Sequence, residues 1–256
     1  MAPNPMNRTL TDILIMVKRN LLRYRRMPQL IVFSFIQPVM FVLLFAYVFG
    51  GAIHTDTKYI NYLIPGIIVQ TVIFGAMMTG VGLADDLSKG MIDRFRSLPM
   101  ARSAVLAGRT ISETIRNFFV IIVMTLVGYA IGFRIEHGFF KYFLAILLTL
   151  LFGFAFSWVS ATIGLAVKNV EIAQTAGFIW VFPLVFASSI FVPTNTLSGP
   201  VKWFAEHNPI SYTTNTVRAL SLGTPVGDNV WYSLIWAAAL LIVFVPLAVY
   251  RYRKIS

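Results

Sequence analysis

Cysteine is absent from this chain, and charged side chains are scarce. Without cysteine there is no disulfide, no thiolate nucleophile and no cysteine-ligated metal site. Only 12% of the residues are charged and 57% are hydrophobic, whereas an ordinary soluble domain has about 25% charged residues. A soluble fold of 256 residues has too little interior to hide so much apolar surface. These deficits exclude a soluble protein and indicate a membrane protein.

Sequence signatures of enzymes are also missing. No GxxxxGK[ST] phosphate-binding loop occurs, so this chain is not expected to bind ATP through such a loop. Neither GxSxG nor HExxH is present. His54, His137 and His207 stand far apart, without the spacing of metal ligands. We therefore predict that the chain is not an enzyme and carries no catalytic residue, metal or cofactor.

Long apolar runs make up most of the chain. A helix needs about 20 apolar residues to cross the hydrocarbon core of a bilayer, and these runs lack the alternation typical of barrel strands. They predict an all-α membrane protein. Its six transmembrane helices are expected at residues 29–50, 59–84, 115–133, 142–167, 172–192 and 230–250, within a membrane domain covering residues 29–256.

The basic residues divide unevenly between the two sides of these spans. Sixteen of the 21 lysines and arginines fall on the side that carries both termini and the loops 85–114 and 168–171. Because lysine and arginine gather on the cytoplasmic side of membrane proteins, we expect a multi-pass protein of the cell (plasma) membrane with both termini in the cytoplasm. The net charge of +11 then reflects the membrane topology of the chain, and no nucleic acid is expected as a partner.

A basic segment at residues 1–28 precedes the first span. Its apolar residues recur at three- and four-residue spacing, which predicts an amphipathic helix lying in the membrane interface. The apolar stripe consists of Leu10, Ile13, Leu14, Val17, Leu21 and Tyr24. Two interpretations remain open for this helix: a simple positive-inside anchor, or an elbow helix that also contacts a cytoplasmic partner.

The predicted spans contain no charge at mid-depth. A carrier coupled to protons or ions usually keeps ionisable residues there, so the pattern favours transport driven from outside the membrane domain, or no transport. Neutral polar and aromatic side chains are the remaining candidates for the lining of a substrate path. The candidates are Gln37, Phe41, Phe45, Gln70, Phe74 and Phe182.

Small residues recur on two of the spans. Gly128 and Gly132 form a GxxxG pattern in the third span, and Gly153 and Gly164 belong to a ridge of small residues in the fourth. Such residues let helices approach closely. We expect packing within the chain rather than a contact between two copies.

Residues 193–229 lie between the fifth and sixth predicted spans, and they are too polar to span and too apolar for a plain loop. Short helices are predicted at residues 201–206 and 210–222, with Asn208 before Pro209 as the start signal of the second. Irregular backbone at membrane depth requires shielding by protein or a wet cavity. A re-entrant helical hairpin entering from outside is favoured, and a surface loop with an interfacial Trp203 is the alternative.

The loop at residues 85–114 is strongly charged and cytoplasmic by the same charge count. Asp85 and Asp86 can start a short helix, because negative charge is favourable at a helix N-terminus, and Pro99 should end it. A second helix, from about Ser103, leads into the third span. A short protruding helix suits docking into a groove on another protein, and a solvated loop is the plain alternative.

Two groups of motifs carry a family resemblance. The first is DRFRSLPMARSAVLAGR at residues 93–109, preceded by Asp86 and Gly90. The second comprises FVPTNTL at 191–197, WFAEHNPISY at 203–212 and VRAL at 217–220. In order and spacing these motifs resemble the ABC type-2 transporter permeases, in particular the daunorubicin-resistance-type drug-export permeases. Many such permeases carry glutamate where Asp86 stands.

The resemblance implies the permease subunit of an ATP-driven exporter that moves an amphiphilic small molecule, drug or lipid by alternating access. It implies a second permease, either another copy or a homologue, and two separate ATPase subunits that hold ATP and Mg. The substrate path would lie between the two permeases, along the second and fifth spans. A coupling helix around residues 86–96 would contact the ATPase, with a second, shorter contact at residues 168–171.

The resemblance also assigns candidate residues to these roles. The ATPase-coupling candidates are Asp86, Lys89, Gly90, Met91, Ile92, Asp93, Arg94, Phe95, Arg96, Lys168 and Glu171. The outer hairpin would act as a gate, and its candidates are Pro193, Trp203, Asn208 and Pro209. Two other functions remain open: a polysaccharide or glycolipid exporter, and a membrane scaffold that binds an ATPase without transporting.

Overall fold

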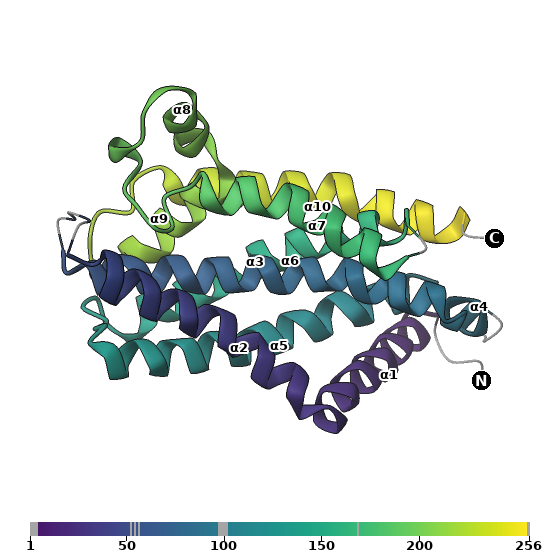
Figure 1. Ribbon diagram of the computed structural model, residues 1–256. Helices are drawn as coiled ribbons and strands as arrows, with labels where there is room; N and C mark the ends of the chain where they lie inside the picture. The colour runs from purple at the N-terminus through teal and green to yellow at the C-terminus, as the bar shows by residue number, and fades with distance from the viewer. Residues whose placement is uncertain are drawn as a thin grey trace.

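A computed structural model describes residues 5–51, 53, 55, 57–96, 102–167 and 169–254, and these residues form a bundle of helices without strands (Figure 1). The first half contains α1 (Pro5–Arg26), α2 (Pro28–Leu43), the π-helical continuation η1 (Leu44–Phe49), α3 (Tyr59–Ser88), α4 (Met91–Arg96) and α5 (Arg102–Ile131). The second half contains α6 (Phe139–Gly164), α7 (Val170–Phe186), the short 3-10 helix η2 (Thr194–Thr196), α8 (Gly199–His207), α9 (Pro209–Leu222) and α10 (Asn229–Lys254).

Each of the six predicted spans coincides with an apolar helix. Among the described residues, four helices are long and apolar enough to cross a membrane: α3, most of α5, α6 and α10. The other two apolar segments are shorter, at Ser34–Phe49 and Val170–Phe186. The helix expected from about Ser103 and the third span are one continuous helix, α5, because no breaker interrupts that stretch. The structure therefore establishes a multi-pass, all-helical chain with four long candidate spans.

Helix α3 occupies the centre of the bundle (Figure 1). In its most apolar window 83% of the residues are buried, against 17% for the corresponding window of α10. Close approach to α6 requires small residues, because a side chain at Gly80 would overlap the backbone of Ser160 and one at Gly164 would overlap the backbone of Gly80. Gly128 on α5 likewise packs on Ile64. Gly128 and Gly164 thus pack within the chain, as predicted, whereas nothing lies within 4 Å of the position that a side chain at Gly132 would take.

The end of α3 differs from the prediction for the charged loop. Asp85 and Asp86 lie in the last turn of α3 and do not start a new helix, so that part of the prediction is wrong. The chain turns at Gly90, whose φ is 65°, a conformation that glycine adopts without strain, and α4 follows at once. Pro99, expected to end the short helix, lies outside the described residues.

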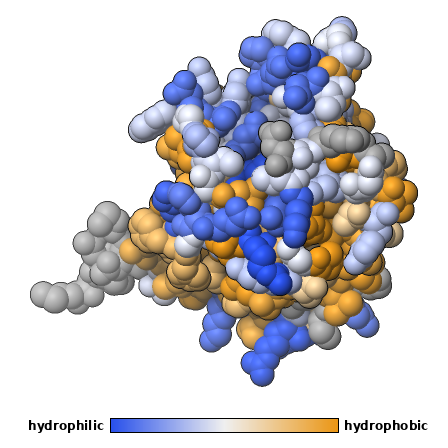
Figure 2. Space-filling view, turned by 90° about the vertical axis from the view of Figure 1, so that its left-hand side faces the viewer, coloured by the Kyte–Doolittle hydropathy of each residue, from blue (hydrophilic) through white to orange (hydrophobic). Residues whose placement is uncertain are grey.

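The first turn of α1 and the last turn of α10 lie at the same end of the bundle as α4 (Figure 1). The opposite end carries the connection from α5 to α6 and the hairpin of α8 and α9. Figure 2 faces that opposite end and shows hydrophilic residues gathered over it, with hydrophobic residues around them. This distribution suits a bundle that crosses a bilayer along its length.

Helix α1 packs along the start of α5 through a face that overlaps the predicted apolar stripe only in part, since Val17 of the stripe is buried there. Asn20 Nδ2 donates to the Gly108 carbonyl at 3.3 Å, and Met16 is buried against Gly108. Leu10 and Leu14, members of the stripe, are 58% and 67% exposed. The predicted helix is confirmed, and its leucines point away from the bundle, where a membrane surface would cover them.

Candidate functional site

A buried carboxylate joins three helices at the α4 end of the bundle. Asp86 Oδ2 lies 3.3 Å from Arg19 Nη2 on α1 and 3.4 Å from Arg109 Nη1 on α5. The Asp86 side chain is only 9% exposed. A buried charge is tolerated when it is paired and hydrogen-bonded, and here two arginines serve one carboxylate. Asp86 therefore ties the end of α3 to α1 and α5.

Arg19 extends this cluster to α4. Its guanidinium lies over the ring of Phe95, 4.5 Å from the centroid, a favourable cation–π geometry. Burial lowers the pKa of Arg19, and the neighbouring Asp86 opposes that shift. The side chain still carries its charge at neutral pH, because arginine starts from a pKa far above 7. Arg19 thus connects α1 with both α3 and the short α4.

Two further carboxylates complete the charged cluster. Asp85 Oδ1 lies 2.7 Å from Lys89 Nζ, and Asp85 Oδ2 lies 3.5 Å from Arg23 Nη2 on α1. Glu113 on α5, buried, accepts hydrogen bonds from the Tyr24 hydroxyl and from Arg116 Nε at 2.8 Å. Burial and the charge of Glu113 raise the pKa of Tyr24, which keeps its hydroxyl protonated as a donor.

The predicted ATPase-coupling residues divide by exposure. Lys89, Arg94 and Glu171 are exposed, and Met91 and Phe95 are half-buried, whereas Asp86 and Ile92 are buried. Nothing lies within 4 Å of the position that a side chain at Gly90 would take. The side chains of Asp93 and Arg96, and residue Lys168, lie outside the described part of the chain. The ATPase contact stays a prediction, whose accessible members are Lys89 and Arg94 at α4 and Glu171 at the start of α7.

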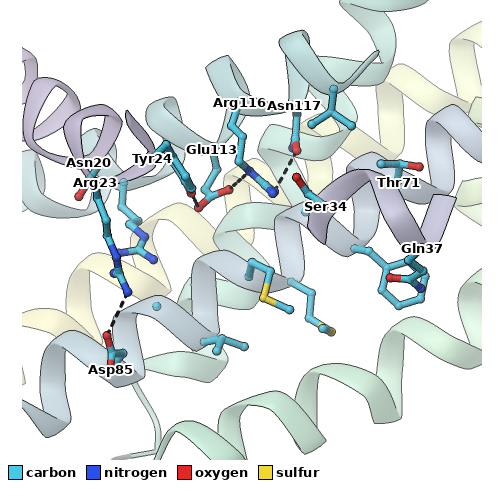
Figure 3. A pocket seen from close by; sticks show the side chains of 18 of the residues that line it. Asn20, Arg23, Tyr24, Ser34, Gln37, Thr71, Asp85, Glu113, Arg116 and Asn117 are labelled. Carbon is cyan, nitrogen blue, oxygen red and sulfur yellow. Dashed lines mark hydrogen bonds and ion pairs between the residues drawn. The ribbon is translucent and has the colours of Figure 1, made fainter. Parts of the chain in front are cut away.

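A cavity of about 530 Å³ opens beside this cluster (Figure 3). Tyr24, Glu113, Arg116 and Asn117 lie along one side of the cavity, and Arg23 reaches toward Asp85 at one end. Its apolar lining comes from α3, α5 and α7: Phe74, Met77, Met78, Val81, Val120, Val170 and Phe178. The cavity therefore has a charged end and an apolar wall.

Two residues that line the cavity each carry a buried polar atom without a hydrogen-bond partner among the described residues. They are Gln70 Oε1, on a side chain only 2% exposed, and Arg109 Nε. An unsatisfied buried polar atom is unfavourable by about 1–3 kcal/mol. One is an acceptor and the other a donor, and both belong to residues at the cavity wall.

The candidate substrate-path residues also divide. Gln37, Gln70 and Phe74 line the cavity, whereas Phe41, Phe45 and Phe182 do not. Phe178 lines it too, and sequence reasoning missed it because nothing in its neighbourhood distinguishes it from a lipid-facing residue.

A chain of ring contacts leads from the cavity toward the outer hairpin. Ring centroids lie 5.8 Å apart for Phe74 and Phe182, 5.1 Å for Phe182 and Phe186, and 5.3 Å for Phe186 and Phe191. Phe45 stacks on Phe191 at 4.3 Å. Phe45, Phe74 and Phe182, expected from the sequence to line a path, thus belong to a connected aromatic row, and their role in a path stays a prediction.

The hairpin of α8 and α9 is anchored by Asn208. Its Oδ1 accepts from the Ile210 N–H at 2.9 Å as the cap of α9, and its Nδ2 donates to the carbonyls of Leu184 at 2.7 Å and Ala187 at 2.8 Å. These bonds satisfy carbonyls at the end of α7, which terminates at Phe186, before the predicted end at residue 192. The two predicted short helices are confirmed as α8 and α9.

The other candidate gate residues occupy different positions in the hairpin. Pro209 is the first residue of α9, and Pro193 precedes η2. Trp203 is 65% exposed and stacks on His207, as an interfacial tryptophan would.

Arg218 is a buried cation that sequence reasoning did not select. Its Nε and Nη2 donate to the carbonyls of Tyr62 and Ser189, both at 3.0 Å, and its Nη1 donates to Asn215 Oδ1 at 2.9 Å. The guanidinium also lies over the Tyr62 ring. Arg218, itself on α9, therefore joins that helix to α3 and to the segment that follows α7. The available signal was the single charge in α9, inside the VRAL motif.

Comparison with known proteins agrees with this architecture. The ABC-2 type transporter family matches residues 11–222. The chain is 33% identical over 237 residues to the daunorubicin resistance ABC transporter permease protein DrrB1 of Streptomyces coeruleorubidus, covering 92% of this chain and 84% of that one. It is 25% identical over 246 residues to the probable doxorubicin resistance permease DrrC of Mycobacterium tuberculosis, covering 95% and 88%.

A more distant relative is the putative transport permease ycf38 of Cyanophora paradoxa, 22% identical over 220 residues, with 82% of this chain and 73% of the relative covered. The family match and the identity to DrrB1 extend over most of the chain and include both groups of motifs. In this family the ATPase is a separate subunit, with which the permease associates. The chain belongs to the ABC-2 type transporter family, as a multi-pass membrane permease subunit homologous to the drug-resistance export permeases.

Proposed function

We propose that this chain carries an amphiphilic small molecule, drug or lipid outward across the cell membrane, driven by a separate ATPase. In this proposal α2 with η1, α3, α5, α6, α7 and α10 are six spans, and both termini lie in the cytoplasm. Residues 1–28 form the elbow, and residues 193–229 the re-entrant hairpin. The relatives named for daunorubicin and doxorubicin resistance support export of an amphiphile.

The observation that carries the proposal is the two-sided lining of the cavity. Charged and polar groups from α1 and α5 stand at one end, and Phe74, Met78 and Phe178 form an apolar wall. An amphiphile presents the same division between a polar group and an apolar body. A polysaccharide would need polar groups along the whole path, so this lining favours an amphiphile over the polysaccharide alternative.

The conformational change driven by ATP hydrolysis would be transmitted to the permease through α4. Two ATPase subunits, holding ATP and Mg, would contact α4 and the start of α7 on two permeases. A displacement of α4 would act on Arg19 through Phe95 and on Asp86 through Arg19. Because Arg109, a partner of Asp86, lines the cavity, the same movement would reshape the site. Alternating access would then be completed by the outer hairpin, held by Asn208 and Arg218.

The experiment replaces two rings of the apolar wall. In the permease reconstituted with its ATPase in vesicles, Phe74→Ala combined with Phe178→Ala should reduce ATP-dependent doxorubicin transport about tenfold, because each ring contact contributes about 0.5–1.5 kcal/mol. Basal ATP hydrolysis should persist. Phe119→Ala, on a ring 60% exposed, is the matched control and should transport normally.

Unchanged transport by the double variant would contradict the assignment of this cavity. ATP hydrolysis by the unmodified complex without transport of any amphiphile tested would favour the alternative of a non-transporting scaffold.

A further inference from the structure

The charged end of the cavity carries more cations than carboxylates. Four basic side chains line it, and the described acidic residues in the lining are Asp85 and Glu113. The basic residues are Arg23, Lys89, Arg109 and Arg116. Extending the count to the neighbouring pair Arg19 and Asp86 gives five cations against three carboxylates, so the excess of two remains.

The ion pairs do not use all of the donors. Asp85 is shared by Arg23 and Lys89, and the two basic side chains are 43% and 62% exposed. Arg109 gives one nitrogen to Asp86, yet its Nε donates no hydrogen bond within the described residues although the side chain is only 10% exposed. The excess of positive charge around the cavity, with a buried guanidinium donor beside it that no described residue satisfies, indicates an anionic ligand.

The position of this charged end restricts the kind of anion. The lining helix α1 exposes Leu10 and Leu14 away from the bundle, as a helix lying at the membrane surface does. From the charged end the lining continues along Val81, Met78 and Phe74 of α3, toward the middle of the bundle. The cavity thus runs from the depth of the lipid headgroups to the depth of the hydrocarbon chains. A single phospholipid molecule occupies both of these depths.

We propose that this cavity binds an anionic phospholipid of the cytoplasmic leaflet, with its phosphate near Arg23, Lys89 and Arg109 and an acyl chain along the α3 wall. The proposal deepens the proposed function, since it rests on the same cavity and on the same orientation in the membrane. Basic pockets between helices on the cytoplasmic side are suited to anionic headgroups. The phosphate would balance the excess positive charge of these side chains.

The test measures lipid binding directly, so its outcome is independent of transport. The permease–ATPase complex is placed in nanodiscs, and its association with spin-labelled phosphatidylglycerol is compared with that of spin-labelled phosphatidylcholine. The unmodified complex should prefer phosphatidylglycerol. Arg23→Gln with Lys89→Gln should weaken that preference about thirtyfold, because each basic residue near a membrane surface contributes about a factor of five.

Two further variants distinguish lipid binding in this cavity from a general attraction of anionic lipids to the basic surface of the protein. Arg25→Gln with Arg26→Gln removes the same charge from exposed positions of α1 that do not line the cavity, and the preference should persist. Met78→Trp fills the apolar part without changing any charge, and it should reduce binding of phosphatidylglycerol.

Three outcomes would overturn the proposal. The first is equal binding of the two lipids by the unmodified complex, and the second is equal loss in the Arg25/Arg26 and Arg23/Lys89 variants. The third is displacement of the labelled lipid by millimolar inorganic phosphate, which would identify the ligand as free phosphate. Lipid preference without transport would leave this site intact and reject only the proposed function.

Discussion

At the scale of single residues, Asp85 and Asp86 are neighbours in sequence with different environments. Asp86 is enclosed by Arg19 and Arg109, whereas Asp85 is more exposed and pairs with Lys89 one helical turn away. Exposed ion pairs contribute little to stability. Removing one member of a buried ionic cluster leaves uncompensated charge in the interior, which is far more unfavourable.

We expect Asp86→Asn to lower the free energy of unfolding by about 3 kcal/mol, because it leaves two arginines without their counter-charge. Asp85→Asn, the matched control one residue away, should change it by less than about 1 kcal/mol. Thermal unfolding of the purified permease–ATPase complex measures both. Equal shifts of the two midpoints would show that the Asp86 cluster has no special role in stability.

At the scale of elements, α4 is short, and it follows α3 after the turn at Gly90. Its buried side is Ile92, which lies in a small apolar cluster with Leu83 and Leu106. Arg94 is on its exposed side. Packing of Ile92 and the contact of Phe95 with Arg19 hold α4 in place, which leaves the exposed side available to a partner.

Charge reversal on the exposed side of α4 should impair coupling to the ATPase without lowering the stability of the protein. Arg94→Glu is expected to leave the unfolding temperature within about 2 °C of the unmodified complex, since surface substitutions usually change stability by under about 0.5 kcal/mol. Drug-stimulated ATP hydrolysis should fall several-fold, because a charge reversal opposes a complementary partner surface.

Arg25→Glu on the exposed side of α1 serves as the control. Normal stimulation in the Arg94 variant would remove α4 from the proposed contact.

At the scale of the whole molecule, the two ends of the bundle differ in charge and in what they carry. The end with α4 holds the buried ionic cluster and the charged mouth of the cavity, and the opposite end holds the hairpin. Lysine and arginine are enriched at the first end, which predicts its cytoplasmic location.

Because the chain has no cysteine, single introduced cysteines report this orientation directly. Glu206→Cys, at an exposed position of α8, should react with a membrane-impermeant maleimide in intact cells. Ser88→Cys, at an exposed position near α4, should react only after the membrane is permeabilised. Labelling in the reverse order would invert the topology and contradict both the exporter and the lipid proposals.

How much of the structure could be predicted from the sequence differs from one element to another. The hairpin was predicted from Asn208 and Pro209, because capping is a local property of consecutive residues. The role of α1 was predicted only in part: its amphipathic spacing identified a helix, but not that Met16 and Asn20 form the packed face. Asp86 was expected to face a partner protein, and the fold encloses it.

The sequence by itself determined that the protein is a helical membrane protein and which family it resembles, and it predicts which end is cytoplasmic. A bilayer selects for length, composition and charge, and these are readable along the chain. Only the tertiary structure decided the ionic cluster and the cavity, since Asp86 meets partners 67 and 23 residues away. Periodicity shows that a helix has distinct faces, but the face that meets a given neighbour depends on how all the helices pack together.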